Sequence, residues 1–369
     1  MSRRASALRD ELLSLFRRGA DAPLPSVEFD RLARSAFAVQ FEGDPAYHAY
    51  CERRGADPFS VATWRDIPPV PARAFRDVAF ASGPRGARSA VFLTSGTTAG
   101  SARRGAHHVP DLELYDASAL AAFRRFLLPD GASCRFVSLI PSPLETPDSS
   151  LSHMAGVVAG SFGQLGVGWF MHPSSGLDRA GLAAALEDAG AAGEPVLLLG
   201  TSLAFAAWLD ELAAAGRRFA LPDGSRLMDT GGSKGAKRSV PGQELRAAYG
   251  DLLGLPDHAC VNEYGMTELC SQYYDRCLLD GIRGRGGLKA SAPWLAALAA
   301  DPETLAALPD GEPGVLRHVD LANLGSIVAV QTEDVGRVLD GHVELAGRAP
   351  GAEPRGCSLA LELMLDAAE

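Results

Sequence analysis

Lysine is nearly missing from this sequence of 369 residues, which contains only Lys234, Lys237 and Lys289. Positive charge is also in deficit overall, because 45 aspartate and glutamate residues outnumber 35 lysine and arginine residues, for a formal net charge of -10 at pH 7. Proteins that bind nucleic acids normally carry a basic face or stripe that contacts phosphates. The composition therefore argues against a nucleic acid partner.

Long apolar runs are missing as well. No stretch reaches the roughly 20 apolar residues that a membrane-spanning helix needs. Near the N-terminus, Arg3, Arg4, Asp10 and Glu11 interrupt the apolar residues, whereas a secretory signal has an uninterrupted apolar centre. We therefore expect a cytoplasmic protein with no membrane span.

Patterns typical of disulfide scaffolds and zinc sites are absent too. The 6 cysteines include no CxxC pair, and a chain with 47% hydrophobic residues can bury a core without disulfides. The neighbours His107 and His108 would point to opposite faces of an extended strand, and no third ligand is evident, so we reject a zinc site. We expect most cysteines to be reduced and in the core.

What is present, from about residue 135 onward, is an alternation of short apolar runs with longer amphipathic segments. Strands are predicted at Arg135–Ile140, Pro195–Gly200, Arg226–Thr230 and Ala259–Asn262, and a helix at Ser202–Ala215. This order is typical of βαβ units and predicts an α/β fold with a largely parallel sheet flanked by helices. Ligands of such sheets bind beyond the carboxyl ends of the strands.

The two ends of the chain differ from this middle part. The first ninety or so residues are predicted to be helical and loop-rich, with a rigid connection at Pro68–Pro71. After a turn at Gly311–Gly314 the pattern becomes strand-like through Ser326–Gln331.

A segment rich in serine, threonine and glycine, Thr94–Gly100, follows the predicted strand Val91–Leu93. Small residues let backbone N–H groups approach an anion closely, and Arg103 and Arg104 can add bidentate positive charge. The segment predicts a loop that holds a triphosphate, and an ordinary turn is the alternative. Its candidate phosphate-binding residues are Thr94, Ser95, Gly96, Thr97, Thr98 and Gly100.

A second motif, Asn262–Glu268, combines an aromatic ring, a glycine, a hydroxyl and a carboxylate at the end of a predicted strand. Tyr264 can stack on a purine and Asn262 can bond its exocyclic amine. Thr267 can reach a phosphate, and Glu268 can hold Mg²⁺. The alternative is a strand end whose tyrosine packs for stability, but the two motifs in this order favour a nucleotide site.

The two motifs resemble the phosphate loop and the Tyr-Gly-x-Thr-Glu motif of the adenylate-forming superfamily of acyl- and aminoacyl-activating enzymes. Asp229–Gly232 resembles the glycine pair beside the adenine, and Gln331–Asp334 resembles the Thr-Gly-Asp segment, with Glu333 in place of its glycine. The resemblance implies the use of ATP and Mg²⁺, with Asp334 on the ribose hydroxyls. It adds to the nucleotide-binding candidates Gly231, Gly232, Gly265 and Arg348.

Further segments are similar to the LuxE-type acyl-protein synthetases of bacterial fatty acid reductase: Pro141–Pro143, Asp148–Met154, Asp229–Gly235 and Gly347–Leu359. This resemblance runs from about Phe92 onward. It implies a large N-terminal adenylate-forming domain at residues 1–334 and a short C-terminal segment at 335–369, with the C-terminal lid domain truncated or absent. It also implies that a fatty acid is adenylated, passed to a cysteine near the C-terminus and handed to a reductase partner.

Cys357 occupies the matching position of that cysteine. Arg348 and Arg355 lie nearby in the sequence, and positive neighbours lower the pKa of a thiol and favour the nucleophilic thiolate. A small buried hydrophobe is the alternative for a lone cysteine. That core interpretation is kept for Cys260, Cys270 and Cys277.

His153 follows a serine-rich turn, where it is a candidate for binding the acid. A structural histidine is the alternative.

Full-length members of the superfamily carry a lysine on the mobile C-terminal domain that contacts the reacting carboxylate and phosphate. No lysine follows Lys289 here, so other cations must serve the phosphate. The candidates are Arg103, Arg104, Lys234 and Arg348. For Lys234, a solvated basic turn is the alternative.

The resulting hypothesis is a ligase that forms an acyl-AMP from a carboxylic acid, typically a fatty acid, and captures the acyl group on Cys357. Two alternatives stay open. In the first, the acyl group goes to coenzyme A or to an amine. In the second, the chain is a degenerate nucleotide-binding scaffold that docks to a reductase, an idea motivated by the missing lysine domain.

Overall fold

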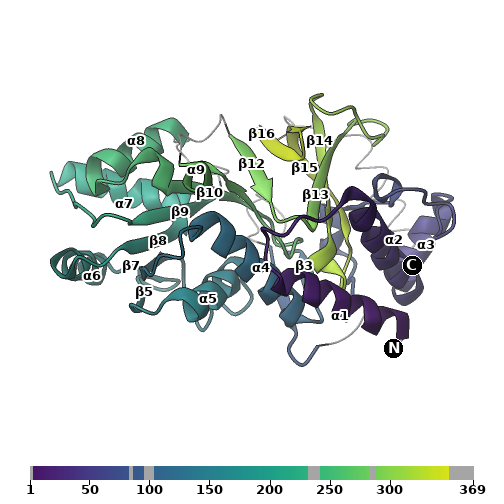
Figure 1. Ribbon diagram of the computed structural model, residues 1–369, viewed down its shortest axis with the longest axis horizontal. Helices are drawn as coiled ribbons and strands as arrows, with labels where there is room; N and C mark the ends of the chain where they lie inside the picture. Colours follow the sequence, from purple (N-terminus) through teal and green to yellow (C-terminus); the bar gives the residue numbers. More distant parts are fainter. Residues whose placement is uncertain (1–2, 83–85, 95–103, 232–241, 282–286, 349–369) are drawn as a thin grey trace.

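The computed structural model describes residues 3–82, 86–94, 104–231, 242–281 and 287–348 (Figure 1). The chain opens with the helices α1 (Arg3–Arg17), α2 (Ser26–Gly43) and α3 (Pro45–Arg53). Asp44 starts α3 because its side chain accepts a hydrogen bond from the backbone N–H of Tyr47 at 2.9 Å, and Pro45 takes the first helical position. The prediction of a helical N-terminal region is confirmed.

In the described part of the chain, 12 strands form one sheet in the order β13-β14-β15-β16-β12-β11-β10-β9-β8-β4-β5, with β1 paired to β15. Their bounds are β1 Val70–Pro71, β4 Arg135–Leu139, β5 Val167–Trp169, β8 Val196–Thr201, β9 Arg226–Thr230, β10 Cys260–Tyr264, β11 Tyr273–Asp275, β12 Leu288–Ser291, β13 Leu295–Ala300, β14 Gly314–Asp320, β15 Ala329–Leu339 and β16 His342–Arg348.

The strands β5, β4, β8, β9 and β10 run parallel. The helices of this half are α4 (Leu112–Leu127), α5 (Ser150–Phe162), α6 (Arg179–Ala192), α7 (Ser202–Ala214) and α8 (Gly242–Leu253). Alternate strand residues enter two cores: Met228 and Val261 pack with α4 and α5, whereas Leu227 and Cys260 pack with α6, α7 and α8. The predicted βαβ arrangement is confirmed for this half.

In the other half of the sheet β10 to β16 pair antiparallel, and only the short β1 pairs parallel to β15, so the sheet is mixed rather than largely parallel. No long helix crosses between these strands in the described part of the chain. Asp340 and Gly341 join β15 to β16 with φ angles of 49° and 75°, a left-handed pair that suits a two-residue hairpin. Because such a turn reverses the chain at once, the strands it joins must be antiparallel.

Several short elements complete the described structure. The hairpin of β2 (Ala90–Leu93) and β3 (Ala106–Val109) lies outside the main sheet, as does that of β6 (Met171–His172) and β7 (Gly176–Leu177). The short helices are α9 (Cys277–Asp280) and the 3₁₀ turns η1 (Trp64–Asp66), η2 (Ala72–Arg76), η3 (Asp257–Ala259) and η4 (Leu321–Asn323). The predicted division at residue 334 stays a prediction.

The cysteines of the described ranges lie in the interior. Cys51, Cys134, Cys260, Cys270 and Cys277 are buried and unpaired, as the core interpretation of the cysteines predicted. Cys357 lies outside the described residues. Among the helices of those ranges, none has the length and apolarity needed to cross a membrane.

Candidate active site

The predicted motifs meet at the carboxyl ends of the central parallel strands. β9 ends at Thr230, and Gly231 follows it with a φ of +80°, a left-handed conformation that favours glycine. β10 is paired in parallel beside β9 and ends at Tyr264, the first residue of the Tyr-Gly-x-Thr-Glu motif. This is the edge at which open α/β sheets bind ligands.

Tyr264 and Asp334 come together at this edge although they are 70 residues apart in the chain. The Tyr264 hydroxyl donates to Asp334 Oδ2 at 2.9 Å, and both side chains are buried. The carboxylate can only accept, so the 3.3 Å contact between the Tyr264 hydroxyl and His318 Nε2 requires the ring nitrogen to donate. His318 Nδ1 then accepts from the hydroxyl of Tyr273 at 2.9 Å. The result is a relay from Tyr273 through His318 and Tyr264 to Asp334.

The relay is electrically neutral except at its end. Burial lowers the pKa of His318 to about 4, against the attraction of the Asp334 carboxylate. The histidine is therefore uncharged at neutral pH and acts as a hydrogen-bond bridge. Arg348 in β16 is paired in register with Asp334, so two predicted nucleotide-site residues are neighbours in the backbone.

Asn262 is held at both ends of its amide. Its Nδ2 donates to Asp229 Oδ1 at 2.9 Å, and its Oδ1 accepts from the Lys289 ammonium at 2.7 Å. Lys289 also donates to the Asn262 carbonyl and to Asp275 Oδ1, both at 2.9 Å. In this structure the amide thus serves a buried network, and the adenine contact assigned to Asn262 stays a prediction.

The Asp229 carboxylate anchors the turn after β9. It accepts from Asn262, from the hydroxyl of Tyr249 at 3.1 Å and from the Ser202 hydroxyl at 2.9 Å. Burial raises the pKa of Asp229 while these donors lower it. Ser202 Oγ also lies 2.8 Å from the Gly231 carbonyl, so the start of α7 is tied to the predicted glycine pair. Gly232 lies outside the described residues.

Glu263 points to the opposite face of β10 from Tyr264. Its Oε2 accepts a hydrogen bond from the Thr230 hydroxyl, and the side chain is buried. Burial raises the pKa of Glu263 to about 7, although the Thr230 hydrogen bond and the Lys289 charge act in the other direction. A Cβ atom at Gly265 would lie 2.4 Å from Glu263 Oε1, so any larger residue there would have to displace the Glu263 carboxyl group.

The predicted phosphate loop is closed at its base by a hairpin. Thr94 N donates to the Gly105 carbonyl at 2.9 Å, and Arg104 donates to the Thr94 carbonyl at 2.6 Å and to Asp148 Oδ2 at 2.8 Å. Arg104 thus braces the base of the loop. The other loop and cation candidates lie outside the described residues: Ser95, Gly96, Thr97, Thr98, Gly100, Arg103 and Lys234.

The same hairpin contacts the second motif. His107 in β3 is buried, and its Nδ1 lies 2.6 Å from the carbonyl oxygen of Thr267. Burial lowers the pKa of His107 to about 4, so the ring is neutral and Nδ1 donates. The hairpin that precedes and follows the predicted loop therefore contacts the Tyr-Gly-x-Thr-Glu turn directly.

Glu268 has the chemistry for Mg²⁺, which is usually held by one or two carboxylates with water and substrate phosphates. Its backbone is fixed by a 2.7 Å hydrogen bond from Asn323 Nδ2, and its side chain is buried at 8% exposure. Within the described ranges no group of three or more histidine, cysteine, aspartate or glutamate side chains is placed to hold a metal. Glu268 fits a magnesium ion shared with phosphates, and its role stays a prediction.

His153, the predicted acid-binding residue, lies in the first turn of α5. Its Nε2 is 2.7 Å from Asp116 Oδ1, and its ring packs against Phe92 and Tyr115 with centroid distances of 5.3 and 5.2 Å. These contacts place it on the α4 and α5 face of the sheet. Its contact with an acid stays a prediction.

Three residues of this edge were not among the predicted site residues: Lys289, Glu263 and His318. Glu263 lies inside the motif Asn262–Glu268, and Lys289 is one of three lysines in the sequence. Their partners come from neighbouring strands, so sheet topology was needed to find them.

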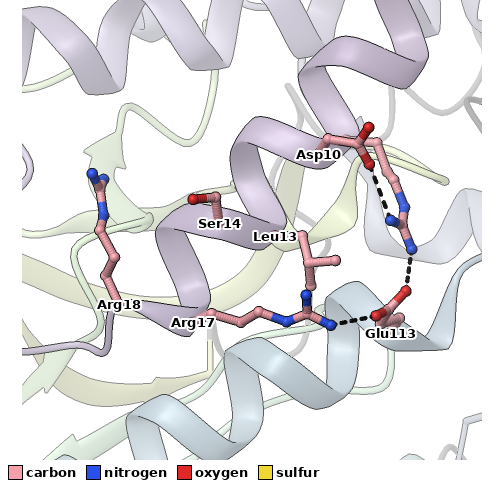
Figure 2. A pocket seen from close by; sticks show the side chains of 7 residues that line it. Asp10, Leu13, Ser14, Arg17, Arg18 and Glu113 are labelled. Carbon is pink, nitrogen blue, oxygen red and sulfur yellow. Dashed lines mark hydrogen bonds and ion pairs between the residues drawn. The ribbon is translucent and has the colours of Figure 1, made fainter.

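A hollow of about 530 Å³ lies elsewhere, between α1 and α4 (Figure 2). Its walls are Arg9, Asp10, Leu13, Ser14, Arg17, Arg18 and Glu113. Arg9 and Arg17 both pair with Glu113 across it. None of the predicted site residues lines this hollow, and we assign it no part in the site.

Solved structures with a similar fold include two CoA ligases. An open conformation of 2-hydroxyisobutyryl-CoA ligase in complex with 2-HIB-AMP and CoA matches with a TM-score of 0.62 and 16% identity, over 92% of this chain and 79% of that chain. A long-chain-fatty-acid-CoA ligase from Archaeoglobus fulgidus matches with a TM-score of 0.50 and 15% identity, over 70% and 51%. The chain spans 50% of the length of ATP-bound MatB from Rhodopseudomonas palustris, at a TM-score of 0.48, 18% identity and 73% coverage of this chain. Comparison with curated proteins finds no match.

The fold is that of the adenylate-forming ligases. Among the described residues, hydrogen bonds join Asn262 to Asp229 and Tyr264 to Asp334 at the ends of β9 and β10. Within that class, the sequence model of the acyl-protein synthetase family LuxE matches residues 171–365, more than half of the chain. The chain belongs to this family.

Proposed function

We propose that this protein uses ATP and Mg²⁺ to activate a carboxylic acid, in particular a fatty acid, and transfers the acyl group to its own Cys357. The observation that carries the nucleotide part is the 2.9 Å hydrogen bond from Tyr264 to Asp334. This bond joins two residues that were predicted separately to bind the nucleotide. Family membership and the 2-HIB-AMP complex of the similar ligase support the chemistry.

In the first step, a carboxylate oxygen of the acid attacks the α-phosphorus of ATP, and the bond to the bridging oxygen breaks as pyrophosphate leaves. Asp334 accepts from the ribose hydroxyls, and Tyr264 holds that carboxylate in position. Glu268 would hold Mg²⁺, which would balance charge on the phosphates. Arg103, Lys234 and Arg348 are the proposed cations for the remaining phosphate charge, with Thr267 as a phosphate donor.

In the second step, the thiolate of Cys357 attacks the acyl carbon of the acyl-AMP. The bond from the acyl carbon to the phosphate oxygen breaks, and AMP leaves with the electron pair. The resulting thioester can pass its acyl group to a reductase partner by a second transfer of the same kind.

ATP-pyrophosphate exchange tests the first step without assuming an acceptor. We expect exchange that depends on a carboxylic acid and on Mg²⁺, measured with labelled pyrophosphate across a panel of fatty, hydroxy, amino and aromatic acids. The variant Asp334→Asn tests the ribose contact in the same assay, and it should raise the KM for ATP. Tight ATP binding with no exchange for any acid would instead support the scaffold alternative.

A second acceptor is favoured by the names of two similar structures, because both are CoA ligases. If the acyl group goes to coenzyme A, product analysis after incubation with ATP, acid and coenzyme A finds acyl-CoA in catalytic excess over enzyme. In that case Cys357→Ser leaves the yield unchanged.

A further inference from the structure

The turn that carries Thr267 and Glu268 is fixed by side chains that lie far from it in the sequence. His107 in β3 holds the first of these two residues, because its Nδ1 donates to the Thr267 carbonyl at 2.6 Å. Asn323, the last residue of η4, holds the second, because its Nδ2 donates to the Glu268 carbonyl at 2.7 Å. The candidate phosphate donor and the candidate magnesium ligand therefore have separate anchors.

The Asn323 side chain is set in one orientation by contacts at both ends of its amide. Its Oδ1 accepts from the Cys270 thiol at 3.0 Å, while its Nδ2 faces the Glu268 carbonyl. A carbonyl oxygen can only accept, so a flipped amide would bring two acceptors together at Glu268. Asn323 is only 1% exposed, so water has little access to these hydrogen bonds. The amide thus ties Glu268 and Cys270 to η4 as one unit.

The segment that presents Asn323 is joined to the same turn a second time by Asp320. Asp320 Oδ1 accepts from the backbone N–H of Ala322 at 3.0 Å and so caps the start of η4. Its Oδ2 accepts from the backbone N–H groups of Cys270 at 2.9 Å and Ser271 at 2.8 Å. One buried carboxyl group therefore fastens the start of η4 to the residues that follow Glu268.

Gln40 connects η4 to helix α2. Its Nε2 donates to the carbonyls of Asn323 at 3.0 Å and Leu324 at 3.1 Å, and its Oε1 accepts from the Val328 N–H at 3.0 Å. Gln40 is buried, and a buried amide whose donors and acceptor are satisfied makes its surroundings rigid. The N-terminal helices thus support the position of Glu268 through η4.

We propose that Asn323 is a positioning residue for the magnesium site: it fixes the backbone of Glu268 so that this carboxylate can hold Mg²⁺ beside the ATP phosphates. This inference rests on the proposed use of ATP and Mg²⁺. Mg²⁺ demands nearly ideal octahedral geometry, so a small displacement of a carboxylate ligand weakens its binding. Loss of a side chain that orients a metal ligand typically costs roughly 10- to 100-fold in metal affinity.

The decisive measurement is ATP binding rather than turnover, by isothermal titration calorimetry of the full chain with Mg²⁺ and with EDTA. In the wild type we expect Mg²⁺ to tighten ATP binding. Asn323→Ala should lose most of that gain, on the order of tenfold. Its affinity for ATP in EDTA should change little, because His107 still holds Thr267.

Glu268→Gln shows whether Asn323 acts through Glu268. This variant alone should lose the gain in ATP affinity from Mg²⁺, and adding Asn323→Ala should cause no further loss of that gain. If Asn323 merely stabilised the fold, its replacement would weaken ATP binding equally with Mg²⁺ and with EDTA.

Two milder variants change the orientation of the Asn323 amide without replacing it. Cys270→Ala removes the donor to Asn323 Oδ1 and should lose part of the gain from Mg²⁺, whereas Cys270→Ser keeps a donor and should retain it. The matched control is Tyr47→Phe, which removes a buried hydrogen bond to the Pro68 carbonyl and should leave the gain unchanged.

The outcomes separate this inference from the proposed function. An unchanged gain from Mg²⁺ in Asn323→Ala, an equal loss of affinity with Mg²⁺ and with EDTA, or a further loss in the double variant would overturn the positioning role and leave ATP binding standing. If Asn323→Ala does not fold, equal gains in Cys270→Ala and Cys270→Ser would overturn it. A wild type that gains nothing from Mg²⁺, or that binds no ATP, would overturn the proposed function and this inference with it.

Discussion

The hydroxyl of Tyr264 donates to the carboxylate of Asp334 at 2.9 Å, and this bond joins the parallel half of the sheet to the antiparallel half. Tyr264 ends β10, whereas Asp334 lies in β15, several strands away in the sheet order. Asp334, which the resemblance implies for the ribose hydroxyls, is thus oriented by Tyr264, which was predicted to stack on the purine.

Removing that hydroxyl tests the relay. We expect Tyr264→Phe to raise the KM for ATP about three- to tenfold with little change in kcat, because a hydrogen bond contributes about 0.5–1.5 kcal/mol and would be lost equally in ground and transition states. Steady-state exchange kinetics measure both parameters. Tyr273→Phe, which removes a hydroxyl farther along the relay, should have a smaller effect. An unchanged KM in Tyr264→Phe would contradict the role of the relay.

Lys289 should be important for stability despite lying outside every predicted motif. Lys289→Met removes the cation at 2.9 Å from the buried Asp275 carboxylate and leaves it the longer Arg246 contact at 3.5 Å. We expect a loss of about 3 kcal/mol in the free energy of unfolding, at the lower end for a broken buried pair. Urea denaturation measures it. Arg337→Met, which breaks the exposed pair with Glu344, is the matched control and should change stability little. Similar losses in the two variants would show that the buried network is not what stabilises the fold.

Glu263 should make stability fall as pH rises. Its folded pKa of about 7 lies above its ordinary value of 4.5, so between these values the folded chain binds more protons than the unfolded chain. The contribution is fully present below pH 4.5 and is lost as pH approaches 7. Relative to Glu263→Gln, the wild type should lose up to about 3 kcal/mol across this window.

The comparison of wild type with Glu263→Gln removes the contributions of other buried groups to the pH dependence of stability. His107 and His318, whose pKa values are lowered to about 4, act in the opposite sense and weaken the fold as pH falls. Both are present in wild type and variant, so they drop out of the difference. Denaturant titrations at several pH values provide the measurement, and a difference that does not depend on pH would contradict a raised pKa for the buried Glu263 carboxyl group.

Gly265 and Glu263 should be energetically coupled. A Cβ at residue 265 would lie 2.4 Å from Glu263 Oε1, so Gly265→Ala must displace the buried carboxyl and should cost about 1–3 kcal/mol. In a Glu263→Ala background the same substitution should cost much less. A double-mutant cycle read by denaturation measures the coupling, and additive effects would argue against this contact.

Cys357 is tested by trapping the thioester. Incubation with ATP and a radiolabelled acid should label the wild type through a hydroxylamine-sensitive bond, whereas Cys357→Ser should carry no such label. Exchange should persist in the variant, because adenylation precedes transfer. Cys134→Ser is a suitable control, because that thiol is buried in the core. Equal labelling of wild type and Cys357→Ser would remove Cys357 from the mechanism.

Much of the parallel half could be predicted from the sequence because its strands are apolar runs separated by helical periods. Arg226–Thr230 was predicted with the bounds that β9 has, and β10 differed by one or two residues at each end. The antiparallel half was harder, because hairpins such as Asp340–Gly341 carry no intervening helix to signal topology.

The site residues also fall into two groups, those that could be predicted from the sequence and those that could not. Tyr264 and Asp334 were recognised because each sits in a short motif. Lys289 and His318 act through side chains from other strands, and the sequence spacing between a residue and its cross-sheet partner carries no periodic signal. Glu263 was visible inside its motif, but its burial and its contact with Thr230 depend on the neighbouring strand β9.

The five buried cysteines contribute little to the reactivity of the protein toward alkylating reagents. Burial raises the pKa of Cys51 and Cys260 to about 12 and raises those of Cys134, Cys270 and Cys277 as well. Such thiols carry almost no thiolate at neutral pH and react slowly with alkylating reagents. A fast alkylation of the native protein would therefore report on the sixth thiol, so that a single time course with a fluorescent maleimide could follow the occupancy of Cys357 without any cysteine having to be removed.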